Sequence, residues 1–140
     1  MIYNREKIIH IFAISVIILG IISTVYVNAY KEKNNSSNEI IINGNSFDIS
    51  IIFSNINEIK IITDEGEKSG IPLDQLIDYS GENCPSCFKY QIIGSDGYKQ
   101  TVTWQDMENG VLSLDRIAFF PHLAHPFWVR DIIEIAVKKI

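Results

Sequence analysis

The chain has 140 residues and a formal net charge of −5 at pH 7, and this charge is unevenly distributed. Residues 1–33 carry four basic and two acidic side chains, whereas the remaining 107 residues carry eight basic and fifteen acidic ones. Nucleic-acid binding depends on neutralising phosphates, so this acidic part is unsuited to such a partner. Two cysteines are too few for a disulfide-dense scaffold, and the length predicts one domain.

An apolar segment near the N-terminus is the clearest feature of the sequence. No residue from Ile8 to Tyr30 is charged. About twenty helical residues span roughly 30 Å, the thickness of the hydrocarbon core of a bilayer. A small soluble domain has nowhere to bury a helix that is apolar all round. We therefore predict a transmembrane helix at residues 8–29, with a cytoplasmic tail at residues 1–7 and the C-terminal domain outside the cytoplasm.

This helix is expected either to stay as a signal anchor in the cell membrane or to be removed as a signal peptide. Arg5 and Lys7 form a basic n-region, and Val27-Asn28-Ala29 has small residues at the spacing that signal peptidase favours. The apolar run is longer than the roughly 7–15 residues of a signal-peptide core, which favours the anchor. Cleavage remains the alternative.

The rest of the chain is expected to be an α+β domain. Residues 30–38 are polar and unpatterned, as in a linker, and the domain would occupy residues 39–140. Pro72 fits the first position of a helix that ends at Gly81, and Thr103 with Asp106 resembles a capping box that opens a short helix ending at Gly110. Tight turns are expected at residues 64–66 and 95–97. The predicted strands are residues 39–43, 47–53, 58–63, 88–94, 98–104, 114–120 and 127–137. The domain would thus be mostly strands with two short helices.

Cys84-Pro85-Ser86-Cys87 is a C-x-x-C motif, which serves in disulfides, metal sites and thiol redox catalysis. In a redox site the helix that follows the motif lowers the pKa of the first thiol. Here the following residues, Phe88–Ile93, alternate like a strand. An exported domain also lies in an oxidising compartment, which favours a local disulfide between Cys84 and Cys87.

His122 and His125 form an H-x-x-H pair in a loop bounded by two prolines. With the two cysteines they make a nominal zinc set, but the separation from Cys87 is far outside zinc-finger spacing. We favour polar loop residues over zinc ligands, and no metal site is predicted.

The order of the motifs resembles the oxidoreductase molybdopterin-binding domain, the sulfite-oxidase-like family. GIPLDQLIDYSG (residues 70–81) is similar to its GVxLxDLLxxAG helix, and YQIIGSDGY (residues 90–98) to its VxFxSxDGY strand and turn. RIAFFP (residues 116–121) and WVRDI (residues 128–132) resemble its closing segments. The resemblance covers residues 39–137 and implies the sulfite-oxidase-like molybdopterin-binding fold.

The sequence departs from this family where the metal binds. The family's enzymes hold molybdenum with a cysteine upstream of the helix at residues 70–81, but no cysteine here precedes Cys84. Arg130 falls where the family has a basic residue that approaches the pterin phosphate, so the resemblance implies Arg130 as a cofactor-binding residue.

The resemblance therefore implies a scaffold that has lost its metal centre. We expect a non-catalytic binding or accessory domain, partnered with the membrane and with a membrane redox or envelope protein, and no cofactor. The alternatives are a divergent molybdopterin-dependent oxidoreductase and a thiol-disulfide oxidoreductase using Cys84 and Cys87.

Overall fold

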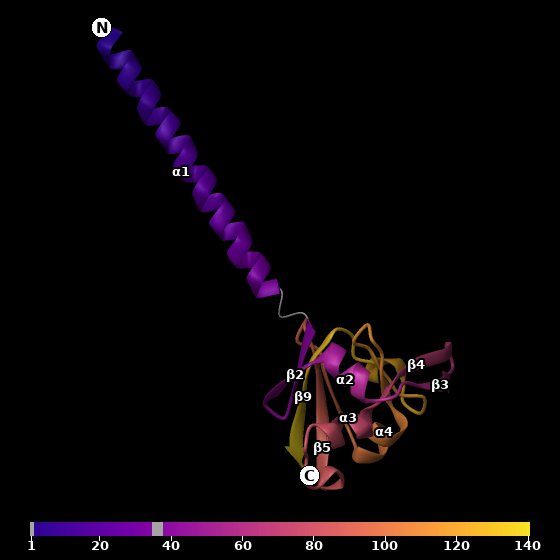
Figure 1. The fold of residues 1–140 in the computed structure, drawn as a ribbon. Helices are drawn as coiled ribbons and strands as arrows, with labels where there is room; N and C mark the ends of the chain where they lie inside the picture. The colour runs from indigo at the N-terminus through magenta and orange to yellow at the C-terminus, as the bar shows by residue number, and fades with distance from the viewer. Residues whose placement is uncertain (1, 35–37) are drawn as a thin grey trace. The chain divides into compact units, whose positions relative to one another are not determined.

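A computed structural model describes residues 2–34 and 38–140 of the chain. It divides into two units, residues 1–37 and residues 38–140. The first unit is the helix α1, Ile2–Asn34 (Figure 1). Its window Lys7–Thr24 has a mean hydropathy of 2.2 and none of it is buried, so α1 is long and apolar enough to span a membrane.

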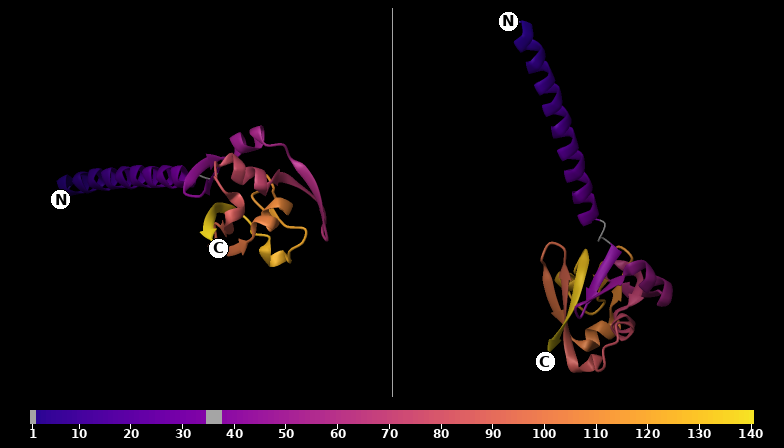
Figure 2. Two further views of the ribbon diagram at one scale, coloured as in Figure 1. Left: turned by 90° about the horizontal axis from the view of Figure 1, so that it is seen from below. Right: turned by 60° about the vertical axis from the view of Figure 1, so that its left-hand side comes forward.

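The second unit is an α+β domain built on two sheets, with strands and short helices in alternation (Figures 1 and 2). The predicted α+β class is therefore confirmed. Its elements are β1 (Glu39–Ile42), β2 (Asn45–Asp48), α2 (Ile49–Asn55), β3 (Ile59–Thr63), β4 (Gly66–Pro72), α3 (Leu73–Tyr79), η2 (Pro85–Cys87), β5 (Phe88–Gly94), β6 (Lys99–Val102), α4 (Trp104–Asn109), β7 (Val111–Leu112), β8 (Ala118–Phe119), η3 (His125–Phe127) and β9 (Ile132–Lys139).

The larger sheet has the strand order β2-β1-β9-β5-β6, and the smaller one has the order β3-β4-β7-β8. β1 and β9 run parallel, and the other neighbouring strands run antiparallel. The three short α-helices lie between the larger sheet and the β3–β4 hairpin, which forms one side of the domain (Figures 1 and 2).

One apolar core joins the two sheets and the helices. Its side chains come from alternate positions of the strands and from one face of each helix, which is the pattern of elements with one buried side. Its fully buried members include Ile40, Ile42, Ile71, Leu73, Leu76, Ile77, Tyr90, Ile92, Met107, Phe120 and Ile135.

Three predicted strands are wrong in part. The strand predicted at residues 47–53 ends at Asp48, and Ile49–Asn55 is a helix. The Asp48 carboxylate accepts hydrogen bonds from the N–H groups of Ser50 and Ile51 and so caps this helix. Ile49, Ile52 and Ile56 are buried at helical spacing. The domain therefore has three short α-helices among the described residues, not two.

Two closing strands are predicted at residues 114–120 and 127–137, but the observed strands in this segment are shorter. Only Ala118–Phe119 and Ile132–Lys139 are strands. Arg116 (φ 61°) and Asp131 (φ 48°) lie in the left-handed region, which bends the chain where straight strands were predicted.

Three other local predictions are confirmed, whereas Pro72 is the N-cap residue of α3 and not its first helical residue. β5 spans Phe88–Gly94 as predicted, and Gly81 adopts a φ of 87° after α3. Thr103 and Asp106 form the predicted capping box of α4, which ends at Gly110.

Candidate functional site

A pocket of about 230 Å³ lies where three segments of the domain meet. The β5–β6 turn contributes two residues, the η3 loop contributes two, and the segment leading into β9 contributes two more. These residues are Asp96, Tyr98, His125, Pro126, Trp128 and Arg130. Arg130 and the 95–98 turn, singled out separately in the sequence, therefore line the same pocket.

The β5–β6 turn is fixed by its own side chain. Asp96 Oδ1 accepts a hydrogen bond from the Tyr98 N–H at 2.9 Å, which is the usual role of Asp in a turn. Gly97 adopts a φ of 85°, which only glycine takes at little cost. The backbone thus sets where Asp96 and Tyr98 stand in the pocket.

Tyr98 ties this turn to the η3 loop. Its hydroxyl donates to the carbonyl oxygen of Pro126 at 2.7 Å and accepts from Gln100 Nε2 at 2.8 Å. The two walls of the pocket are therefore joined by a hydrogen bond, although they lie 28 residues apart in the sequence.

Arg130 is positioned through its main chain. A Cβ at Gly94 would lie 2.7 Å from the Arg130 carbonyl oxygen, so only glycine allows this close approach. The Ser95 N–H donates to the Asp131 carbonyl at 2.9 Å, and the Ser95 hydroxyl donates to the Asp131 carboxylate. These contacts fix the main chain at Arg130 and at the following residue, Asp131.

The Arg130 guanidinium has no hydrogen bond or ion pair with any other residue in the described part of the chain. A guanidinium presents paired N–H donors that match the oxygens of a carboxylate, sulfate or phosphate group. Arg130 is therefore available to bind an oxyanion that enters the pocket.

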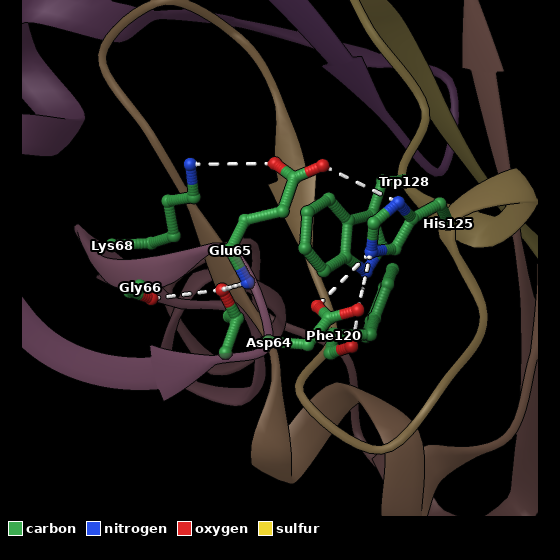
Figure 3. Close-up of polar contacts among 8 residues, drawn as sticks. Asp64, Glu65, Gly66, Lys68, Phe120, His125 and Trp128 are labelled. Carbon is green, nitrogen blue, oxygen red and sulfur yellow. Dashed lines mark hydrogen bonds and ion pairs between the residues drawn. The ribbon is translucent and has the colours of Figure 1, made fainter.

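His125 forms the opposite wall and bridges two acidic side chains (Figure 3). Its Nε2 lies 2.8 Å and 3.0 Å from the two Asp64 oxygens, and its Nδ1 lies 3.3 Å from Glu65 Oε1. A neutral imidazole has only one N–H donor, so both contacts are favourable only when the ring is protonated. Residues 64 and 65 form the tip of the β3–β4 hairpin, so His125 fastens that tip to the η3 loop.

This arrangement shifts the pKa values of both partners. The hydrogen bond that His125 donates to the Asp64 carboxylate raises the pKa of His125 above its usual 6.5, against the opposing effects of desolvation and of Lys68. The hydrogen bond from His125 lowers the pKa of Asp64 below 3.8. Both shifts favour the charged forms of the two side chains, which make up the ion pair.

The Trp128 ring packs against the His125 ring. The two rings stack with centroids 4.2 Å apart and planes 29° apart. The indole N–H donates to the Phe120 carbonyl at 3.0 Å, and only 7% of Trp128 is exposed. The floor of the pocket is thus a rigid part of the core.

The other predicted candidates lie in different surroundings. His122 is exposed and does not line the pocket, so the structure uses only His125 of the H-x-x-H pair there. Asp64 and Glu65 had been predicted only as turn residues, because nothing local indicates a partner 61 positions further along the chain.

Cys84 and Cys87 are joined to each other in a disulfide, with Cα atoms 5.4 Å apart. The motif lies on the one-turn η2, which is followed directly by β5. The Tyr90 hydroxyl donates to the Pro85 carbonyl at 2.7 Å, and burial together with Glu82 and Asp78 raises the pKa of Tyr90 to about 12. No α-helix N-terminus follows these cysteines to activate a thiol.

The donor set does not fit a molybdenum centre. The chain's only two cysteines are bonded to each other, so no thiolate is left to act as the ligand that the sulfite-oxidase-like enzymes use. Within residues 2–34 and 38–140, no three His, Cys, Asp or Glu side chains are grouped so that they could hold a metal ion. A pocket of about 230 Å³ is also smaller than the roughly 300–1,000 Å³ typical of small-molecule sites.

Comparisons with known proteins add no relative: neither the protein-family models nor the curated proteins gave a match to this chain.

Proposed function

We propose that this chain is a membrane-tethered, non-catalytic domain of sulfite-oxidase-like fold that acts as a binding or accessory subunit outside the cytoplasm. The apolar helix α1 supports the tether. The α+β domain and the motifs at residues 70–98 support the scaffold. The mutual disulfide of the two cysteines supports the loss of the metal centre.

The observation that carries the proposal is the unpaired Arg130 guanidinium in a small, pre-formed pocket. It offers charge and hydrogen-bond donors to an oxyanion, while the surrounding Asp96, Tyr98 and His125 provide no molybdenum ligand set. Such a pocket suits recognition of one anionic group on a ligand or partner.

Metal analysis of the full chain, purified in detergent from molybdenum-replete cells, tests the loss of the metal centre. We expect well below one molybdenum atom per chain. One molybdenum per chain would overturn the proposal in favour of a divergent molybdopterin-dependent oxidoreductase.

Sulfate binding tests the role of Arg130. We expect sulfate to shift the NMR signals of the Asp96–Tyr98 turn in a saturable way, and the substitution Arg130→Gln to abolish this shift. Lys99→Gln is the matched control, because Lys99 is an exposed cation next to Tyr98 that does not line the pocket. Equal losses in the two variants would show non-specific charge screening and would remove Arg130 from the proposal.

The exposure of Cys87 favours one second candidate, a thiol-disulfide oxidoreductase. In that reaction a dithiol of the substrate would be oxidised to a disulfide while the Cys84–Cys87 disulfide is reduced to two thiols. Measurement of the reduction potential and of the Cys84 thiol pKa separates the candidates. A stably oxidised pair with an ordinary thiol pKa leaves only the structural disulfide.

A further inference from the structure

The inner edge of β4 is the second place where the domain presents unused binding groups. On one side β4 pairs with β3 from Gly66 to Gly70. On the other side β7 pairs only with Ile71 and Pro72. The main chain of Leu112 and Ser113 packs against Gly70, so the stretch of β4 without a neighbouring strand on the β7 side is residues 66–69.

The register shows which main-chain groups point to this open side. The two-residue loop 64–65 makes Thr63 and Gly66 a hydrogen-bonded pair, and such pairs alternate along an antiparallel ladder. Ser69, opposite Lys60, and Glu67, opposite Ile62, are therefore non-hydrogen-bonded positions. Their N–H and C=O groups face away from β3, and no loop backbone in the described part of the chain bonds to them.

A pocket of about 560 Å³ adjoins this edge, which is within the usual size range of ligand sites. The segment 113–117 forms its far wall, and Leu114 and Phe119 give it apolar surface. Leu114 is 64% exposed.

The charge of this pocket is mainly negative. Glu58, Glu67 and Asp115 line it, and neither Glu58 nor Asp115 has an ion pair with another residue that the structure describes. Lys68 is the one cation in the lining, and it is drawn to Glu65 at 3.6 Å and lies over the Phe119 ring. The charge of this pocket therefore favours a positively charged ligand.

We propose that this edge binds an extended, basic peptide segment of a partner protein, which adds as a strand antiparallel to β4 in line with β7. The main-chain groups of Glu67 and Ser69 would pair with the peptide backbone, as in β-strand addition. Alternate peptide side chains would meet the Leu114–Phe119 wall and the carboxylates. This site is separate from the Arg130 pocket and does not depend on its ligand.

The binding test uses the full chain in phosphatidylcholine nanodiscs, which carry no net charge, and three labelled peptides followed by fluorescence anisotropy. The first alternates Lys and Val over seven residues, the second alternates Glu and Val, and the third is the basic peptide with alternate amides N-methylated. We expect only the first to bind. No binding of the first peptide at millimolar concentration, or equal binding of the N-methylated peptide, would overturn the proposal.

A matched pair of proline variants locates the edge. Ser69→Pro removes an N–H that faces the pocket, and Lys60→Pro removes one that faces away from β4 on the outer side of β3. Both keep the hydrogen bonds within the hairpin. We expect Ser69→Pro to weaken binding about tenfold or more and Lys60→Pro to change it less than about twofold. The reverse result would place the peptide on β3 and refute the β4 site.

A charge variant keeps the test decisive if the prolines disturb folding. Glu58→Gln with Asp115→Asn should weaken binding of the basic peptide by about threefold to tenfold at low salt, and the effect should shrink as salt is added. Glu108→Gln on α4 is the control, because its carboxylate is exposed and outside this pocket. Unchanged binding in the double variant would refute the assigned charge complementarity.

Discussion

Replacing Trp128 with Phe should destabilise the domain more than the same change at Trp104. The substitution Trp128→Phe removes the buried five-membered ring of the indole, including the N–H that donates to the Phe120 carbonyl. At roughly 0.8 kcal/mol per buried carbon, the lost burial amounts to about 2 kcal/mol. The lost hydrogen bond adds only about 0.5–1.5 kcal/mol, because the Phe120 carbonyl still accepts the N–H of Leu123. The sum is about 2.5–3.5 kcal/mol.

Trp104 is the matched control because it is only half-buried, and its indole N–H has no partner among the described residues. Trp104→Phe should therefore lower the free energy of unfolding by about 1 kcal/mol or less. For a domain of this size, the difference between the variants corresponds to roughly 10 °C in Tm.

Urea unfolding of the full chain, followed by tryptophan fluorescence, measures both values. The two tryptophans of the chain are Trp104 and Trp128, so each variant keeps one reporter and the helix α1 contributes no signal. Equal losses in the two variants, or a loss below about 0.5 kcal/mol for Trp128→Phe, would refute the view that Trp128 is a buried and hydrogen-bonded floor of the pocket.

Three further outcomes follow from named contacts. The contact between His125 and Asp64 should stabilise the hairpin only while both side chains are charged. The contribution of His125 should be complete below about pH 6.5 and should be lost as the pH rises through the raised pKa of His125. The contribution of Asp64 should be lost as the pH falls from 3.8 through the lowered pKa of Asp64. Hydrogen exchange of the hairpin amides measures both limbs, and an unchanged profile in His125→Gln, with His122→Gln as control, would contradict this. Thr103→Ala should lower stability by about 1 kcal/mol through loss of the α4 cap, measured by urea unfolding. Gly94→Ala should lower it by about 1–3 kcal/mol through the clash with the Arg130 carbonyl and should also abolish the sulfate response, whereas retained binding would show that this contact does not position Arg130.

The parts of the fold that the sequence predicts are those whose cause is local. The capping box of Thr103 and Asp106, the glycine at position 81 and the alternation of β5 each act over a few residues, and each is present in the structure. The α2 helix was missed because its isoleucine run has high strand propensity, while the Asp48 cap and the burial of Ile52 favour a helix.

The sequence also fails to predict the contacts of the candidate site that join distant parts of the chain. Arg130 was singled out through a family resemblance, but its companions in the pocket come from turns and loops that are far apart in the sequence. The pairing of His125 with Asp64 joins residues separated by 61 positions, and neither residue type is unusual in a loop. Only the packing of the β3–β4 hairpin against the η3 loop shows that one ring faces two carboxylates.

Main-chain groups hold the Arg130 pocket in shape, together with lining side chains other than Arg130 itself. Gly94 admits the Arg130 carbonyl, the Ser95 N–H holds the Asp131 carbonyl, and Trp128 is fixed by the Phe120 carbonyl. A change of the Arg130 side chain would therefore alter what binds without altering where the pocket lies. This supports a binding role in which the fold positions one cation and the partner provides the anion.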